Sequence, residues 1–304
     1  MLQGGIAGFA LTRAAPAKIN LALHVVGQRA DGHHLLESLV TFADRGDRIG
    51  LVPSSEDRFT LSGHFAAELS APVDDQSGNL VLKARDLLRQ VLSAQGVETT
   101  PVHIHLEKNL PIASGIGGGS ADAAATLRGL IDLWDLRIEP ASLAALALKL
   151  GADVPMCLDG RPLVARGIGE EITPTPDLPS FPIVLVNPRV AVSTPVIFRM
   201  LENKSNPPLV VPAVRGSTVD WLAALAGMRN DLEPPARQLQ PVIADVSGAL
   251  AASGAALVRM SGSGATCFGL FDSDERASRA AHALSAAHPE WYVLSARTRG
   301  RANR

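Results

Sequence analysis

A glycine-rich segment, Gly115-Ile116-Gly117-Gly118-Gly119-Ser120, is the part of this sequence best suited to bind a ligand. Glycines readily adopt positive φ, so consecutive backbone N–H groups can turn inward around an anion. Apolar residues recur at helical spacing over residues 120–134. A helix capped by Ser120 would direct its unpaired N–H groups and positive dipole end at the same point. We therefore predict a phosphate site, with a flexible loop as the alternative.

The loop matches neither of two common nucleotide-binding motifs. No lysine follows the glycines, as the G-x-x-x-x-G-K-[ST] phosphate loop requires. No ribose-binding acid stands where the dinucleotide fingerprint would place one. Asp122, in the expected first turn of the helix, would repel a bound phosphate. Either this side chain points away from the loop or a cation lies between the two.

Asp153 is a candidate catalytic base. It follows a helix predicted at residues 143–150, which we expect Gly151 to close in a left-handed conformation. Pro155 is expected to hold Val154 extended, which would stiffen the turn. A carboxylate on such a turn can accept a proton from an alcohol. An aspartate after a glycine is, however, more often only a turn residue.

Lys18 is a candidate for stabilising the negative charge that develops during a reaction. It lies in a strand predicted at residues 17–26, where alternation places Lys18 and Asn20 on the face opposite the apolar side chains. That face either meets solvent or lines a site. Taken alone, a lysine on a strand is more often a solvated charge.

Two further clusters could support binding. Ser261-Gly262-Ser263-Gly264 separates two apolar runs, so it is either a tight hairpin turn or a place where the backbone approaches a ligand. His103 and His105 have a spacing found in metal sites, but no third ligand stands nearby. We expect these histidines to lie on an exposed strand face.

The elements that must position these residues mix strands and helices without a strict β-α-β repeat, which favours an α+β fold. Residues 161–182 are richer in glycine and proline than the segments before them. This change of composition suggests a boundary between two domains, 1–163 and 164–304. Strands are predicted at residues 17–26, 35–42, 102–106, 183–186, 256–260 and 266–271, and helices at 79–94, 120–134, 143–150, 236–252 and 275–287. Asn79 is expected to cap the first of these helices.

Composition excludes several classes of protein. With 46% hydrophobic and 19% charged residues, the 304-residue chain is typical of a folded domain rather than a disordered one. A formal net charge of −2 gives no excess of positive charge of the kind that nucleic-acid-binding proteins have. No apolar run approaches the roughly 20 residues of a membrane-spanning helix. Two cysteines far apart favour a reducing compartment, so we expect a cytoplasmic protein. The last stretch, with Arg297, Arg299, Arg301 and Arg304, is interpreted as a solvated basic tail, with an anion-binding role as the less favoured alternative.

Together these segments resemble the GHMP kinases, the superfamily of galactokinase, homoserine, mevalonate and phosphomevalonate kinases. The resemblance spans nearly the whole chain and rests on the glycine loop and five other segments. These are Ala17-Lys18-Ile19-Asn20-Leu21, Gly27-Gln28-Arg29-Ala30-Asp31-Gly32-His33-His34, Gly151-Ala152-Asp153-Val154-Pro155, Ser193-Thr194-Pro195-Val196-Ile197-Phe198 and the SGSGATCFG run that begins at Ser261.

The resemblance implies a two-domain α+β kinase with its active site in the cleft between the domains. The N-terminal domain would bind ATP, and the C-terminal one would be ferredoxin-like. Within the superfamily, the match is to members that phosphorylate an alcohol carrying a cytidine diphosphate group. ATP and Mg²⁺ are the implied cofactors, although no Mg²⁺ ligand is identified. The chain would act as a monomer or weak homodimer, without nucleic acid or membrane partners.

The resemblance also implies residue roles. Asp153 would be the base, Lys18 would orient it, and Asn20 would contact the reacting end of the substrate. His34 and Phe198 would sandwich the cytosine, with Thr194 alongside. The residues implied in ATP binding are Asn79, Lys108, Pro111, Ile112, Ala113, Ser114, Gly115, Ile116, Gly117, Gly118, Gly119, Ser120 and Ala121.

Three departures from the family pattern stand out. Ala113-Ser114 replaces a glycine and a small residue at the loop entry, Ala121 replaces a second serine, and His33 stands where tyrosine is frequent. None of them removes Lys18 or Asp153.

Overall fold

The computed structural model describes residues 6, 8–69, 78–175, 177–211 and 216–300. It divides into two compact units that are discontinuous in sequence. The first comprises Met1–Ala17, Gly46–Ile112 and Gly118–Asp159, and the second Lys18–Arg45, Ala113–Gly117 and Gly160–Arg304. The expected division of this chain into contiguous domains at 1–163 and 164–304 stays a prediction.

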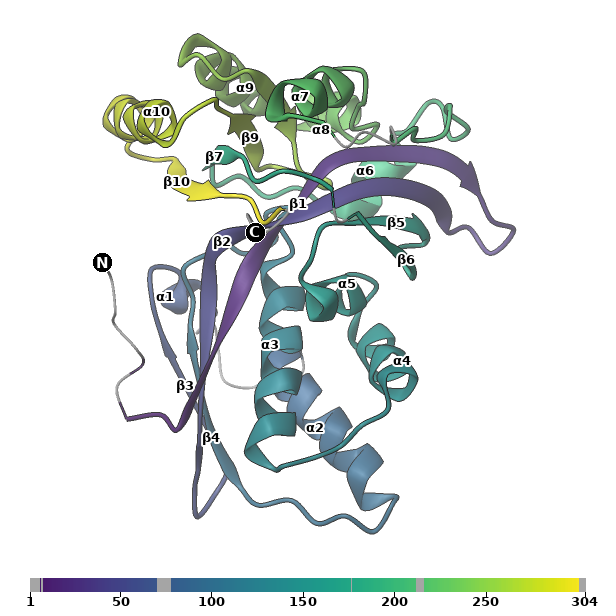
Figure 1. Ribbon diagram of the computed structural model, residues 1–304, viewed down its shortest axis with the longest axis vertical. Helices are drawn as coiled ribbons and strands as arrows, with labels where there is room; N and C mark the ends of the chain where they lie inside the picture. Colours follow the sequence, from purple (N-terminus) through teal and green to yellow (C-terminus); the bar gives the residue numbers. More distant parts are fainter. Residues whose placement is uncertain (1–5, 7, 70–77, 176, 212–215, 301–304) are drawn as a thin grey trace. The chain divides into compact units, whose positions relative to one another are not determined.

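Two long strands contribute residues to both units. β1 (Leu11–Gln28) pairs with β2 (His34–Pro53), and the two run side by side in Figure 1. In the first unit, the end of β2 pairs antiparallel with β4 (Val102–Glu107), which pairs parallel with β3 (Arg58–Ser62). Alternating buried positions on β4 follow the two-residue period of a strand.

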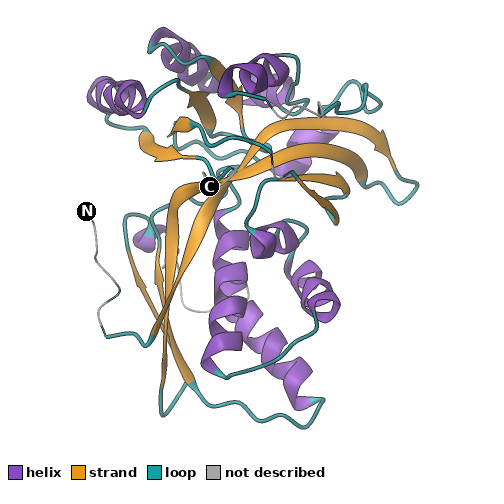
Figure 2. Ribbon diagram, viewed as in Figure 1, coloured by secondary structure: helices purple, strands orange, loops and turns teal. Residues whose placement is uncertain are grey.

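The helices of the first unit are α1 (Ala66–Leu69), α2 (Leu80–Ser93), α3 (Gly118–Leu133), α4 (Pro140–Leu150) and α5 (Val154–Asp159). Asn79 caps α2 as predicted, because its side chain accepts a hydrogen bond of 2.9 Å from Val81 N. Helices α2 and α3 lie side by side (Figure 2). Small alanines and Gly129 bring α3 close to the sheet, since a Cβ at Gly129 would meet Leu51.

The second unit contains a separate antiparallel sheet. Its strand order is β10 (Tyr292–Arg297), β7 (Pro182–Asn187), β9 (Cys267–Leu270) and β8 (Leu257–Met260). Two further strands, β5 (Leu163–Gly167) and β6 (Glu171–Pro174), extend from the start of β2.

Helices cover this second sheet. They are α6 (Thr194–Arg199), α7 (Thr218–Ala226), α8 (Glu233–Leu239), α9 (Val242–Ala252) and α10 (Asp274–Ala287). The core joins Val184 and Val186 of β7 to Ile243 and Leu250 of α9 and Leu284 of α10. No helix in the part of the chain that is described combines the length and the apolar character needed to cross a membrane.

The α+β prediction is confirmed, while several local predictions are wrong. The helix expected at residues 236–252 is two helices, α8 and α9, interrupted at Pro241 because proline lacks the N–H that a continuous helix needs. Gly151 ends α4 with φ 160°, which is extended rather than left-handed. Val154 begins α5 instead of being extended, because Pro155 then occupies a first-turn position where no N–H is needed.

Helix α3 begins at Gly118, two residues earlier than expected. Ser120 therefore lies inside the first turn and does not cap the helix. Asp122 falls just beyond that turn, on the buried side of α3.

Candidate functional site

The first half of the glycine loop has the backbone that the sequence predicts. Gly115 and Gly117 adopt φ values of +76° and +63°, which side chains with a Cβ rarely tolerate. Ala113 also has positive φ, at 49°, so the alanine at the loop entry is held in a conformation that favours glycine. The loop lies directly against β1: Lys18 N donates to Ile116 O at 2.9 Å, and a Cβ at Gly117 would lie 3.0 Å from Lys18 Cβ.

The turn at residues 261–264 supports this loop. Ser261 Oγ accepts a hydrogen bond from Asn20 N (3.1 Å) and donates one to Gly115 O (3.0 Å). A Cβ at Gly115 would lie only 2.5 Å from Ser261 O. The segment is thus a hairpin turn between β8 and β9 whose backbone closely approaches the glycine loop. Sequence reasoning singled out the turn but missed the role of the Ser261 hydroxyl, because its partners are distant in the chain.

Lys18 and Asn20 are buried, with 5% and 4% of their surface exposed, so Lys18 is not a solvated surface charge. Asn20 Nδ2 donates to Ser38 Oγ at 2.7 Å. Asn20 Oδ1 is buried, and none of the described residues donates a hydrogen bond to it. Such an acceptor needs a water or ligand donor, which suits the predicted contact with a substrate.

His34 and Phe198, the two residues predicted to sandwich the cytosine, lie in direct contact. Their rings stack with centroids 4.7 Å apart and planes 20° from parallel. Burial lowers the pKa of His34, and the charge of Lys204 lowers it further, which favours a neutral ring suited to stacking. Because the two rings are in contact, a pyrimidine can lie between them only if they separate. Thr194 Oγ1 lies 2.6 Å from Ser263 Oγ.

The second half of the loop begins α3 in the first unit. Gly118 lies above Lys108, since a Cβ at Gly118 would be 3.0 Å from Lys108 Nζ. The Lys108 ammonium pairs with Asp122 (2.8 Å) and with Asp47. Lys108 is therefore the cation that pairs with Asp122. Asp47 was not identified from the sequence, where nothing distinguishes it from other strand carboxylates.

Electrostatics in this buried group are dominated by desolvation. Burial, with an additional contribution from Asp47, raises the pKa of Asp122 to about 8 against the opposing effect of Lys108. Burial alone would lower the pKa of Lys108, but the charges of Asp122 and Asp47 raise it overall.

Asp153 lies in the first unit, half-buried, immediately before α5. Its carbonyl accepts a hydrogen bond of 3.1 Å from Cys157 N, which begins the helix. Of the remaining loop residues, Pro111, Ser114 and Ala121 are buried and Ile112 is 39% exposed.

His103 and His105 do not face open solvent, contrary to the prediction. Phe9 packs on both rings, at centroid distances of 5.0 and 5.4 Å, and Thr60 Oγ1 lies 2.8 Å from a nitrogen of each. Among the described residues no group of three or more histidine, cysteine or acidic side chains could hold a metal ion.

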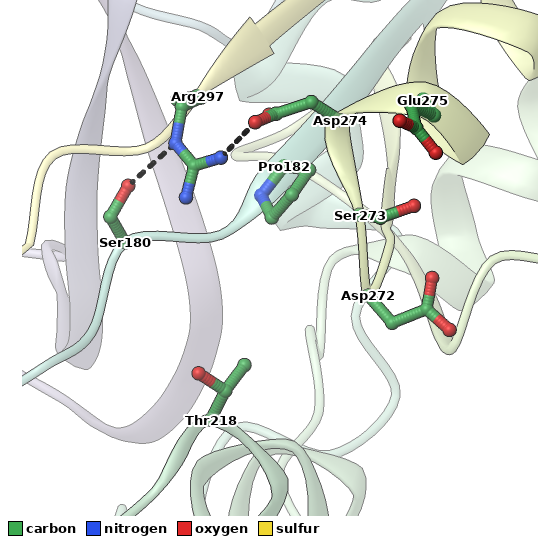
Figure 3. A pocket seen from close by; sticks show the side chains of 8 residues that line it. All are labelled: Ser180, Pro182, Thr218, Asp272, Ser273, Asp274, Glu275 and Arg297. Carbon is green, nitrogen blue, oxygen red and sulfur yellow. Dashed lines mark hydrogen bonds and ion pairs between the residues drawn. The ribbon is translucent and has the colours of Figure 1, made fainter.

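A pocket of about 370 Å³ in the second unit contains none of the predicted site residues. Among its lining residues, Arg297 bridges Asp274 and Ser180 (Figure 3), and the two N···O distances are 2.5 and 3.4 Å. The other lining residues are Pro182, Thr218, Asp272, Ser273 and Glu275. Acidic groups predominate, so this pocket does not suit a phosphate.

Comparison with known proteins agrees with this picture. The family of GHMP kinases matches through its N-terminal domain at residues 79–161 and its C-terminal domain at residues 210–290. The 4-diphosphocytidyl-2-C-methyl-D-erythritol kinases of Rhizobium meliloti (strain 1021) and Sinorhizobium medicae (strain WSM419) are each 70% identical over 99% of this chain and 100% of theirs.

Solved structures give the same result. A crystal structure of 4-(cytidine 5'-diphospho)-2C-methyl-D-erythritol kinase is 36% identical, with a TM-score of 0.78, and the match covers 95% of this chain and 100% of that one. A homoserine kinase from Cytophaga hutchinsonii shares the fold at 21% identity and a TM-score of 0.67, with 95% of each chain covered.

Proposed function

The chain belongs to the GHMP kinases, and on that basis we propose that it phosphorylates 4-diphosphocytidyl-2-C-methyl-D-erythritol. The γ-phosphoryl group of ATP is transferred to the 2-hydroxyl of the erythritol, a step in non-mevalonate isoprenoid precursor synthesis. The observation that carries this proposal is 70% identity along the full length of kinases bearing that substrate's name.

Asp153 and Lys18 are the proposed catalytic residues. Asp153 accepts the hydroxyl proton as the oxygen attacks the γ-phosphorus, and Lys18 orients the carboxylate and offsets developing charge. Both residues must reach the same substrate hydroxyl. Phosphoryl transfer depends mainly on such positioning and charge stabilisation rather than on covalent chemistry. The burial of Lys18 against the glycine loop supports this role, because a buried ammonium interacts strongly with phosphate.

The substrate's cytosine is placed between His34 and Phe198, with Thr194 alongside and Asn20 near the reacting end. The existing ring stack supports this proposal, because it shows that the two aromatic faces can be parallel. The unsatisfied oxygen of Asn20 supports a hydrogen bond from a substrate hydroxyl.

The triphosphate is placed along residues 111–121, with Asn79 on the adenosine side and Lys108 buried beneath Gly118. Support comes from the positive φ of Gly115 and Gly117 and from the start of α3 at Gly118, since the first N–H groups of a helix have no partner within it. Mg²⁺ is expected with the nucleotide, held largely by phosphate oxygens and waters. When bound, it neutralises phosphate charge.

The proposed setting is the cytoplasm, with the enzyme a monomer or weak homodimer. Cys157 and Cys267 are buried thiols, which suits a reducing compartment. Sedimentation velocity at several concentrations tests the assembly, and a stable dimer at the lowest concentration contradicts it.

The deciding experiment is ³¹P NMR of purified protein with ATP, Mg²⁺ and 4-diphosphocytidyl-2-C-methyl-D-erythritol. A new phosphomonoester signal, absent with homoserine or mevalonate as acceptor, is expected. Activity on one of those acceptors alone would retain the superfamily and overturn the substrate. Nucleotide binding without any transfer would indicate a non-catalytic relative.

A further inference from the structure

The buried Asp47–Lys108–Asp122 group contains two carboxylates and one ammonium. Exposed fractions are 1% for Asp47 and 3% for each of Lys108 and Asp122. With both carboxylates ionised, the group carries one uncompensated negative charge. A buried charge without a partner is costly and is commonly removed by a change of protonation.

Hydrogen bonding identifies which carboxyl group takes the proton. Asp47 Oδ1 accepts from Asn109 N (2.5 Å) and Leu110 N (2.8 Å), and Asp47 Oδ2 accepts from Lys108. Within the described part of the chain, the hydrogen bond that Asp122 accepts comes from Lys108, through Oδ2. Its Oδ1 is buried and has no partner among the described residues. Asp47 is therefore stabilised as a carboxylate, whereas Asp122 is the group that favours a proton.

Other charged groups around Asp122 do not compensate for it. Helix α2 packs against α3 through apolar residues, its Lys83 is exposed, and its Arg85 and Arg89 pair with Asp57. On α3 itself, Asp132 pairs with Arg13.

On the sheet that α3 also packs against, Arg48 pairs with Glu107. In the described residues, helices α4 and α5 likewise place no ion pair on Asp122. Lys149 of α4 is exposed, and α5 buries Val154, Met156, Cys157 and Leu158. The charges that act on Asp122 among the described residues are Lys108 and Asp47.

The position of this group connects it to nucleotide. Lys108 Nζ lies directly beneath Gly118, the first residue of α3 and part of the proposed phosphate cradle. A phosphate bound there would be repelled by a net negative group below it and would not be repelled by a neutral one. We propose that binding of the ATP phosphates is coupled to uptake of one proton by Asp122, which leaves the Asp47–Lys108–Asp122 group without net charge. The proton comes from solvent and forms an O–H bond on the Asp122 carboxyl group.

This inference rests on the proposed nucleotide site and assigns Asp122 as a positioning residue that acts through Lys108. The pKa of Asp122, raised to about 8 by burial, means that uptake is measurable just above that pH. Below it Asp122 already holds the proton, and no uptake is expected.

The test is calorimetric titration with the ATP analogue AMPPNP and Mg²⁺, in buffers of different ionisation enthalpy, between pH 6 and 9.5. Wild-type protein should take up several tenths of a proton more than Asp122→Asn between pH 8 and 9, and the difference should vanish at pH 6. An uptake of half a proton corresponds to a loss of affinity of about threefold per pH unit, by linkage. Comparing the two proteins cancels ionisation of the nucleotide.

Asp132→Asn is the matched control, a carboxylate farther along α3 that pairs at the surface with Arg13. It should behave as wild type. Equal uptake by wild type and Asp122→Asn would overturn the inference. The pH series on wild-type protein alone provides a second check, since pH-independent affinity above pH 8 is also incompatible with it. Failure of wild type to bind AMPPNP at any pH would overturn the nucleotide site as well.

Discussion

At the scale of single residues, the proposed chemistry depends on a few polar groups placed in apolar surroundings. Lys18 and Asn20 are buried on β1, and His34 stacks on Phe198. Burial strengthens their interactions with a charged substrate, because the local dielectric is lower than in water. Substitution of any of these groups should therefore change substrate binding or turnover more than substitution of a surface residue of the same type.

Asp153→Asn should reduce turnover by about 10²- to 10⁴-fold, because an amide cannot accept the hydroxyl proton. Affinity for AMPPNP should change little, since the base does not hold the nucleotide. Single-turnover kinetics and calorimetric titration measure the two quantities. Asp135→Asn, at an exposed position with φ 50° that asparagine tolerates, is the control. Unchanged turnover would show that this reaction needs no base at Asp153.

His34→Ala and Phe198→Ala should each raise the KM for the cytidine-linked substrate, because each removes one stacking face. The affinity for AMPPNP should remain nearly intact. His282→Ala, an exposed histidine on α10, provides the control. If neither substitution changes KM, the cytosine is bound elsewhere.

At the scale of elements, the glycine loop depends on contacts made on each side of it. Gly115 and Gly117 lie against the turn at residues 261–264 and against β1, while Gly118 begins α3 above Lys108. A loop this rich in glycine has high conformational entropy when unfolded. Its single conformation must therefore come from these neighbours.

Ser261→Ala should lower the free energy of unfolding by about 1–3 kcal/mol, because the buried Asn20 N–H loses its acceptor. It should also weaken AMPPNP binding, since the Gly115 carbonyl is no longer held. Denaturant unfolding and titration provide the measurements. Ser253→Ala, which loses only a local bond to Ala249 O in its own helix, should have a smaller effect on stability and none on binding. Equal effects of both variants on binding would contradict a specific role for Ser261.

Gly119→Ala separates loop conformation from ligand contact. A Cβ at Gly119 would meet only Leu80 Cδ1, at 3.5 Å, so folding should be nearly unaffected. The proposed phosphate lies close to this backbone, so the added methyl group should weaken AMPPNP binding. The melting temperature should not change. Gly115→Ala should instead lower the melting temperature, because φ +76° costs roughly 1–2 kcal/mol for alanine and its Cβ meets Ser261 O. Unaltered affinity in Gly119→Ala would place the phosphate at another part of the loop.

At the scale of the whole molecule, the buried carboxyl group of Asp122 affects global stability. Its pKa is raised from an ordinary 3.8 to about 8, chiefly by burial. Between these values the folded protein binds more protons than the unfolded chain. Stability contributed through Asp122 is therefore lost as pH rises through this window.

Asp122→Asn should flatten the decline in the free energy of unfolding between about pH 4 and 8. Urea unfolding at unit intervals of pH measures the slope, and Asp132→Asn should keep that of wild type. Identical slopes in wild type and Asp122→Asn would show that Asp122 titrates normally in the folded state.

The sequence alone determined the α+β class, the positive-φ glycine loop and the cap at Asn79. These features depend on local rules: the period of apolar residues, the absence of Cβ atoms and the short reach of a capping side chain. The motif segments also identified the superfamily. Errors such as the unbroken helix at residues 236–252 and the left-handed Gly151 arose where local preferences compete.

Only the tertiary structure decided which distant residues meet. It placed the Ser261 hydroxyl between Asn20 and Gly115, and Asp47 beside Lys108 and Asp122. It also covered His103 and His105 with Phe9. These contacts join residues separated by tens to hundreds of positions, and no local periodicity encodes them. Their energies come from desolvation and hydrogen-bond satisfaction, which exist only once the chain has folded.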